Sequence, residues 1–155
     1  LVKNIKYCVD KLKTIFALFP EARYSLDGCT SYIPESTAKL VRLLRVPVVV
    51  LRIHGNFVTQ PQWNKIDKGN HIEAEMIQII TAKECRKLSV AEIDARVKEA
   101  FQYDDFKWQY ENKIQITHPK RAEGLHALLY KCPACQTEGK MDSIFKVRPI
   151  AMARP

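Results

Sequence analysis

The residues best suited to bind a ligand lie in one short segment, residues 19–28. Glu21 and Arg23 stand two residues apart, directly after a run of apolar residues. A guanidinium can hold two phosphate oxygens at once, and a carboxylate can accept hydrogen bonds from hydroxyl groups or orient the arginine. Ser25 adds a hydroxyl donor, and the Asp-Gly pair ending at Gly28 is a turn sequence. The segment indicates a site for a phosphate-bearing ligand. The alternative is a Glu21–Arg23 ion pair that only braces the loop.

Two cysteines near the end of the chain form a second candidate site, Cys132-Pro133-Ala134-Cys135. This is the spacing of a zinc knuckle, in which two thiolates supply half of a tetrahedral site. A structural zinc site needs a second pair, typically about 15–20 residues further on. Residues 136–155 contain neither cysteine nor histidine. The pair therefore predicts an incomplete metal site, to which His118 and His126 could add imidazoles.

The pattern of apolar residues predicts the elements that position these candidates. Helices are expected over 1–12, 36–45, 89–101, 104–112 and 120–130, and strands over 14–19, 46–53, 71–80 and 114–116. Two capping boxes, Thr81-x-x-Glu84 and Ser89-x-x-Glu92, mark further helix starts.

Strand, helix and strand follow one another over residues 14–53, an order that predicts a right-handed parallel crossover. Ligands of α/β proteins bind beyond the carboxyl ends of such strands, where Glu21 and Arg23 would lie. His54 comes directly before Gly55 at the end of the second strand and is the histidine best placed to contact a substrate. The expected fold is α/β, a mostly parallel or mixed sheet covered by helices, with a short Cys-x-x-Cys tail.

Composition narrows the class of protein. The 155 residues are 46% hydrophobic and 27% charged, which suits one folded domain and is too apolar for a disordered chain. Five cysteines are a sparse, odd set, more typical of a reducing cytoplasm than of a disulfide-stapled secreted protein. The net charge of +8 is spread along the chain. It favours an anionic partner, such as nucleic acid, a phosphorylated metabolite or anionic lipid, or else only keeps the surface solvated.

Two segments together resemble a known family, the glycerolipid acyltransferases (1-acyl-sn-glycerol-3-phosphate acyltransferases). They are Phe19-Pro20-Glu21-Ala22-Arg23-Tyr24-Ser25, which resembles the phosphate-acceptor motif, and Val46-Pro47-Val48-Val49-Val50, which resembles the later valine-proline strand. Tyr103-Asp104-Asp105-Phe106 and Arg121-Ala122-Glu123-Gly124-Leu125-His126 look like a bacterial subgroup with a C-terminal zinc ribbon. The resemblance covers roughly residues 1–142. Ala22 stands where the motif usually has glycine, and Arg23 comes one position early.

The resemblance implies an acyltransferase of phospholipid biosynthesis. The acyl group would pass from a thioester, acyl-CoA or acyl carrier protein, to lysophosphatidate or a similar glycerol phosphate. No cofactor is expected beyond zinc in a complete ribbon. Residues 1–130 would be the C-terminal part of the acyltransferase domain and 131–155 an incomplete ribbon. The implied substrate-binding residues are Glu21, Arg23, Ser25, Gly28 and His54.

The family's catalytic His-x-x-x-x-Asp motif lies upstream of the phosphate-binding one, so it is expected before Leu1. His118 and Glu123 have a similar spacing but the wrong chain order, and we treat that match as chance. This chain would then hold the acceptor site without the base and be inactive alone. It would lie in the cytoplasm, peripherally at the anionic inner face of the membrane, with no nucleic acid bound. Two alternatives stay open: a nucleic-acid-binding module with a zinc knuckle, and a non-catalytic α/β binding domain.

Overall fold

The computed structural model describes residues 1–143 and 147–149 and divides the chain into two compact units. The first unit comprises residues 1–53 and 74–104, and the second begins with residues 54–73 and resumes at residue 105. Both helices and strands are present, so the structure has a mixed α/β composition. The sequence-based boundary at residue 131 stays a prediction.

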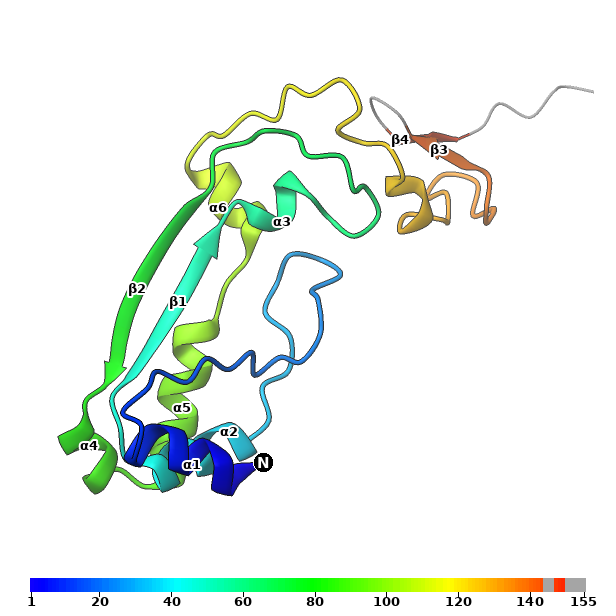
Figure 1. Cartoon of the computed structure of the whole chain (residues 1–155). Coiled ribbons are helices and arrows are strands. Elements are labelled where there is room, and N and C mark those ends of the chain that lie inside the picture. The colour runs from blue at the N-terminus through cyan, green and yellow to red at the C-terminus, as the bar shows by residue number, and fades with distance from the viewer. Residues whose placement is uncertain (144–146, 150–155) are drawn as a thin grey trace, which may run out of the picture. The chain divides into compact units, whose positions relative to one another are not determined.

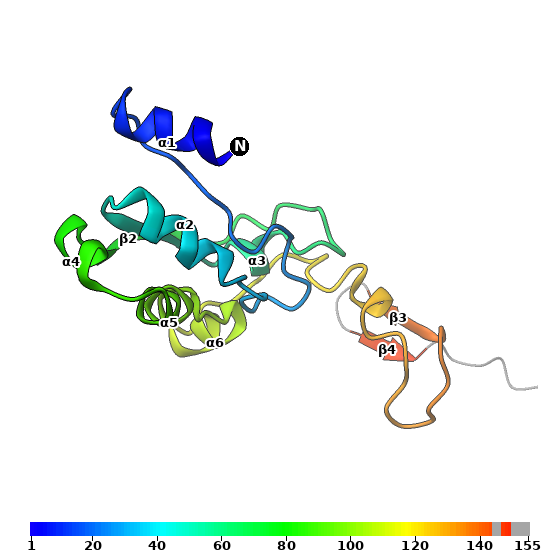
Figure 2. The same cartoon turned by 90° about the horizontal axis from the view of Figure 1, so that it is seen from below.

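The first unit is built around two long strands. These are β1 (Val48–His54) and β2 (Glu73–Ile80), which pair as a two-stranded sheet and run in opposite directions (Figure 1). Its helices are α1 (Val2–Asp10), α2 (Ser36–Leu44), α4 (Ala82–Lys87) and α5 (Val90–Phe101). Helix α5 lies on one side of the sheet and α1 on the other (Figure 2).

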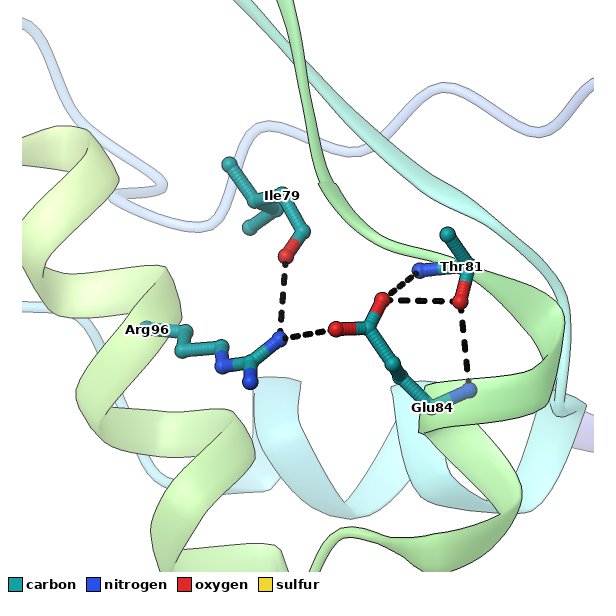
Figure 3. Close-up of polar contacts among 4 residues, drawn as sticks. All are labelled: Ile79, Thr81, Glu84 and Arg96. Carbon is teal, nitrogen blue, oxygen red and sulfur yellow. Dashed lines mark hydrogen bonds and ion pairs between the residues drawn. The ribbon is translucent and has the colours of Figure 1, made fainter.

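The core of this unit lies between α2, α4, α5 and the ends of the strands. Its buried members are Ile33, Ala38, Ile80, Cys85, Ile93 and Val97. The two predicted capping boxes are both present and start α4 and α5. At α4, Glu84 accepts hydrogen bonds from the Thr81 amide at 2.9 Å and from Arg96 of α5 at 2.9 Å (Figure 3). One carboxylate thus fixes a helix start and ties two helices together.

The second unit contains shorter elements: α3 (Asn56–Thr59), α6 (Asp105–Glu111), a 3-10 turn η1 (Leu125–Ala127), β3 (Met141–Ser143) and β4 (Val147–Pro149). Strands β3 and β4 pair antiparallel, with Met141 opposite Pro149 and Ser143 opposite Val147. Within the described residues no helix is long and apolar enough to cross a membrane.

The predicted strand over residues 14–19 is wrong, and with it the parallel crossover. This segment has no regular structure, and Ile15 and Phe19 are 99% and 85% exposed. An apolar run forms a buried strand only when a neighbouring strand pairs with it, and both described sheets have two strands that pair with each other. The described strands are antiparallel rather than mostly parallel.

Two further predictions are wrong near the end of the chain. Residues 114–116 form no strand, and the predicted helix over 120–130 is reduced to turns and η1. Gly124 has φ +81, in the left-handed region, so a right-handed helix cannot pass through it. The predicted helices at 1–12, 36–45, 89–101 and 104–112 are confirmed as α1, α2, α5 and α6, and the strands at 46–53 and 71–80 as β1 and β2.

Candidate functional site

Glu21 holds together the loop that carries the candidate phosphate ligands. Its Oε2 accepts a hydrogen bond from the Ser31 amide at 2.8 Å, which joins the two ends of an eleven-residue segment. No ion pair or hydrogen bond joins Glu21 to Arg23 in the described part of the chain. Glu21 therefore does brace the loop, but through Ser31 and not through Arg23. The Arg23 guanidinium is exposed and remains available for an anion.

A compact turn lies between those two ends. The Ser25 hydroxyl lies 2.8 Å from the Cys29 carbonyl oxygen, to which it donates, and 3.1 Å from Oδ1 of Asp27. The same Oδ1 accepts from the Cys29 amide at 3.1 Å, and this bond is the main reason why the pKa of Asp27 is lowered. Gly28 is buried at φ +78, where a side chain would be strained. Ser25 and Gly28 thus shape the loop.

The loop is anchored at its far end to the last residue of α5 and to the residues that follow this helix. The Thr30 amide donates to the Tyr103 carbonyl at 3.1 Å, the Thr30 hydroxyl donates to the Phe101 carbonyl, and Cys29 forms a β-bridge with Asp104. Burial, followed by the Asp104 and Asp27 charges, raises the pKa of Cys29. Its thiol is therefore held protonated and is not an activated nucleophile.

Ala22 has an unusual backbone conformation within this loop. Its φ is +53, in the left-handed region that favours glycine, and its amide donates to the Phe19 carbonyl at 3.2 Å. The residue occupies the position at which the resembling motif usually has glycine. A left-handed conformation of this kind is costly for a residue that carries a side chain.

His54 is the last residue of β1 and the first residue of the second unit. Its ring stacks on Trp108 of α6, with centroids 5.4 Å apart and an interplanar angle of 25°. The chain then turns at Gly55, whose φ is +80 and where a Cβ would lie 2.6 Å from the His71 carbonyl oxygen. The stacking fixes the ring of His54. The second unit also contains the two cysteines of the Cys-x-x-Cys pair and the candidate imidazoles of His118 and His126.

Asp105 is the residue that sequence reasoning missed in this region. It is 1% exposed, and its two carboxylate oxygens accept from the Gly55 amide at 2.7 Å and the Val58 amide at 2.9 Å. These amides open α3, and a carboxylate is a suitable cap for such unpaired donors. The available signal was an acidic residue at the start of an aromatic-rich helix, noted only as part of the resemblance.

Cys132 and Cys135 lie on a tight hairpin. The Gln136 amide donates to the Cys132 carbonyl, and the Cys132 amide to the Thr137 carbonyl, both at 2.9 Å. Hydrogen bonds lower the pKa of Cys135. The largest effect on this pKa comes from the Thr137 side chain, followed by the Thr137 backbone and then the Cys132 side chain. Among the described residues no three metal-binding side chains gather. Two thiols alone do not complete a four-coordinate zinc site, and we assign no metal to this cysteine pair.

His118 and Glu123 have separate roles. The Lys120 amide donates to Nδ1 of His118 at 3.1 Å, and the Lys120 ammonium lies 3.5 Å from the Glu123 carboxylate. His126 contacts Ser143 of β3, with Nδ1 2.9 Å from the hydroxyl oxygen. These contacts explain the two histidines as structural residues of the second unit.

The structure thus brings together Glu21, Arg23, Ser25 and Gly28 in one anchored loop of the first unit. His54 and the cysteine pair belong to the second unit. The arrangement in the loop offers an exposed guanidinium on a framework fixed by backbone hydrogen bonds. Comparison with models of known protein families, with curated proteins and with solved structures finds no match.

Proposed function

We propose that this chain carries the acceptor-binding part of a glycerolipid acyltransferase. The acceptor would be lysophosphatidate or a similar glycerol phosphate, and the acyl donor a thioester of coenzyme A or acyl carrier protein. The main support is the loop over residues 21–31, which Glu21 closes onto the Ser31 amide while the Arg23 guanidinium stays exposed. The left-handed Ala22 adds to it, because glycine is the usual residue of the resembling motif there.

In this proposal Arg23 binds the acceptor phosphate and Glu21 is a positioning residue that holds the loop. A guanidinium that pairs with phosphate makes charge-assisted hydrogen bonds, which are stronger than those between neutral groups. A preformed loop loses little conformational entropy when the ligand binds, so more of the interaction appears as affinity. We assign the general base that removes the proton from the acceptor hydroxyl to no residue of this chain.

Binding of a water-soluble acceptor tests the assignment. We expect sn-glycerol 3-phosphate to shift the amide NMR signals of residues 21–31, and glycerol to leave them unchanged. Loss of one charge-assisted contact in Arg23→Gln should weaken binding about 10- to 100-fold. Lys65→Gln is the control, since Lys65 is an exposed cation of the second unit. Equal affinity of Arg23→Gln and the unmodified protein would exclude Arg23 as the phosphate ligand.

The membrane is the second partner in this proposal, because the acceptor and the product are lipids. The net charge of +8 supports attraction to an anionic surface. Vesicles that contain anionic lipid should retain the protein at low salt and release it as salt rises. Equal retention on purely zwitterionic vesicles would contradict this part of the proposal.

A further inference from the structure

The first unit has an open hollow that the acceptor loop does not use. It has a volume of about 1040 Å³ and lies between α1, α2 and α4. Its cationic lining residues are Lys6, Lys13, Lys39, Arg42, Arg45 and Arg86, and its single carboxylate is Asp10. Cations from three separate helices, or the residues just after them, thus converge on one surface.

Among the described residues, carboxylates pair with two of these cations. Lys6 pairs with Asp10 at 3.4 Å and Lys39 with Glu35 at 3.2 Å, each within its own helix. Exposed ion pairs of this kind contribute little to stability.

The other four cations pair with no carboxylate in the part of the chain that the structure describes. Arg42 donates to the Cys85 carbonyl at 2.9 Å, a contact that leaves its charge in place. For Lys13, Arg45 and Arg86 the described residues offer no ion pair or hydrogen-bond partner for the side chain. The carbonyl end of α2 lies at Arg45 and offsets part of this charge. The remainder favours an anionic ligand at this surface.

Apolar side chains accompany the cations, and they indicate the kind of anion. Val9, Leu43, Leu44 and Val46 also line the hollow, and no aromatic residue does. Leu12 and Ile15 flank the hollow-lining Lys13 in sequence and are 55% and 99% exposed. Aliphatic groups beside cations suit the boundary between lipid head groups and acyl chains. Binding of single-stranded nucleic acid instead relies on aromatic side chains that stack on bases.

We propose that this surface, the hollow together with Leu12 and Ile15, docks the protein on an anionic phospholipid bilayer. Lipid phosphates would enter the hollow, and the two aliphatic side chains would insert beside them. The inference rests on the proposed function, because the bilayer would supply the acceptor lipid. It assigns membrane contact to a surface separate from the loop over residues 21–31.

Co-sedimentation of the whole chain with vesicles tests the proposal. The probes are vesicles of phosphatidylcholine alone and of equal parts phosphatidylcholine and phosphatidylglycerol. The test variant is Lys13→Gln/Arg45→Gln/Arg86→Gln. The control, Lys65→Gln/Lys113→Gln/Lys140→Gln, removes three exposed cations of the second unit. It is matched in charge, and Lys113 has a positive φ like Arg45 (+55 and +56).

We expect the test variant to bind the anionic vesicles about a hundredfold more weakly, at about fivefold for each cation. The control should lose far less. Ile15→Ser keeps every charge and changes a side chain that is 99% exposed, so it should fold normally and bind severalfold more weakly. Equal losses in the test and control variants, or no effect of Ile15→Ser, would overturn the proposal. So would tighter binding of the hollow to a single-stranded oligonucleotide than to the vesicles.

The outcome separates this inference from the proposed function. Glycerol 3-phosphate should still shift the signals of residues 21–31 in the test variant. If the surface is wrong, the test variant loses no more vesicle binding than the control variant does, while Arg23→Gln still loses the acceptor. If the acceptor site is wrong, glycerol 3-phosphate leaves residues 21–31 unchanged whatever the vesicles show.

Discussion

Replacing Asp105 with asparagine should strongly destabilise the second unit. The buried carboxylate accepts from the Gly55 and Val58 amides at 2.7 and 2.9 Å, and it is 1% exposed. Asparagine offers one acceptor oxygen and one NH₂ donor, so one of these buried amides loses its partner and faces another donor. A buried unsatisfied amide costs about 1–3 kcal/mol, and a hydrogen bond to a charged group contributes about 1.5–3 kcal/mol. The free energy of unfolding should fall by about 2–4 kcal/mol.

Urea unfolding followed by tryptophan fluorescence measures this change. Trp63 and Trp108 are the two tryptophans of the chain, and both belong to the second unit, so their emission reports that unit. Glu111→Gln is the matched control, because it makes the same change of carboxylate to amide on α6 at an exposed residue. We expect the control to stay within about 0.5 kcal/mol of the unmodified protein. An Asp105→Asn variant as stable as this control would refute the role of Asp105 as the cap of α3.

Two further predictions concern the first unit. Ala22→Gly relieves a left-handed conformation that costs alanine about 1–2 kcal/mol, against about 0.5–1 kcal/mol for the greater freedom of glycine in the unfolded chain. Hydrogen exchange of the Ser31 amide should therefore slow in Ala22→Gly and quicken in Ala22→Val; the reverse order would show that Ala22 is unstrained. Hydrogen bonds from the Thr81 amide and side chain, then from Arg96, lower the pKa of Glu84 from 4.5 to about 2. Its folded pKa lies below its unfolded value, so this stabilisation is present above about pH 4.5 and lost as the pH falls towards 2. Thermal unfolding should show a shallower loss of Tm across this range in Glu84→Gln, and parallel curves would contradict the prediction.

The sequence predicted secondary structure best where the signal is local. Thr81 with Glu84, and Ser89 with Glu92, predicted two capping boxes, and both are present, because each depends on residues only three positions apart. The strand β1 was predicted from its valines for the same reason. Such signals need no knowledge of which distant segment lies opposite.

The errors arose where contacts between segments far apart in the sequence decide the structure. The apolar run over residues 14–19 has the composition of a buried strand, but in the described residues no strand pairs with it. The contact between Glu21 and Ser31 spans ten positions, and that between Asp105 and Gly55 spans fifty, so spacing alone could not reveal either. The candidate loop itself was predicted correctly as a loop, whereas the roles of Glu21 and Ser25 in its shape required the structure.

Acyl transfer by the protein translated from its complete reading frame tests the central claim most directly. The assay follows transfer from an acyl thioester to lysophosphatidate, and it compares Glu21→Gln with Glu35→Gln, whose carboxylate pairs with Lys39 at the surface at 3.2 Å. If Glu21 holds the acceptor loop, Glu21→Gln should lower kcat/KM at least about tenfold, because the charge-assisted bond to the Ser31 amide is weakened. Glu35→Gln should leave kcat/KM unchanged. Equal activity of Glu21→Gln and the unmodified protein, or no acyl transfer by the unmodified protein, would contradict the account.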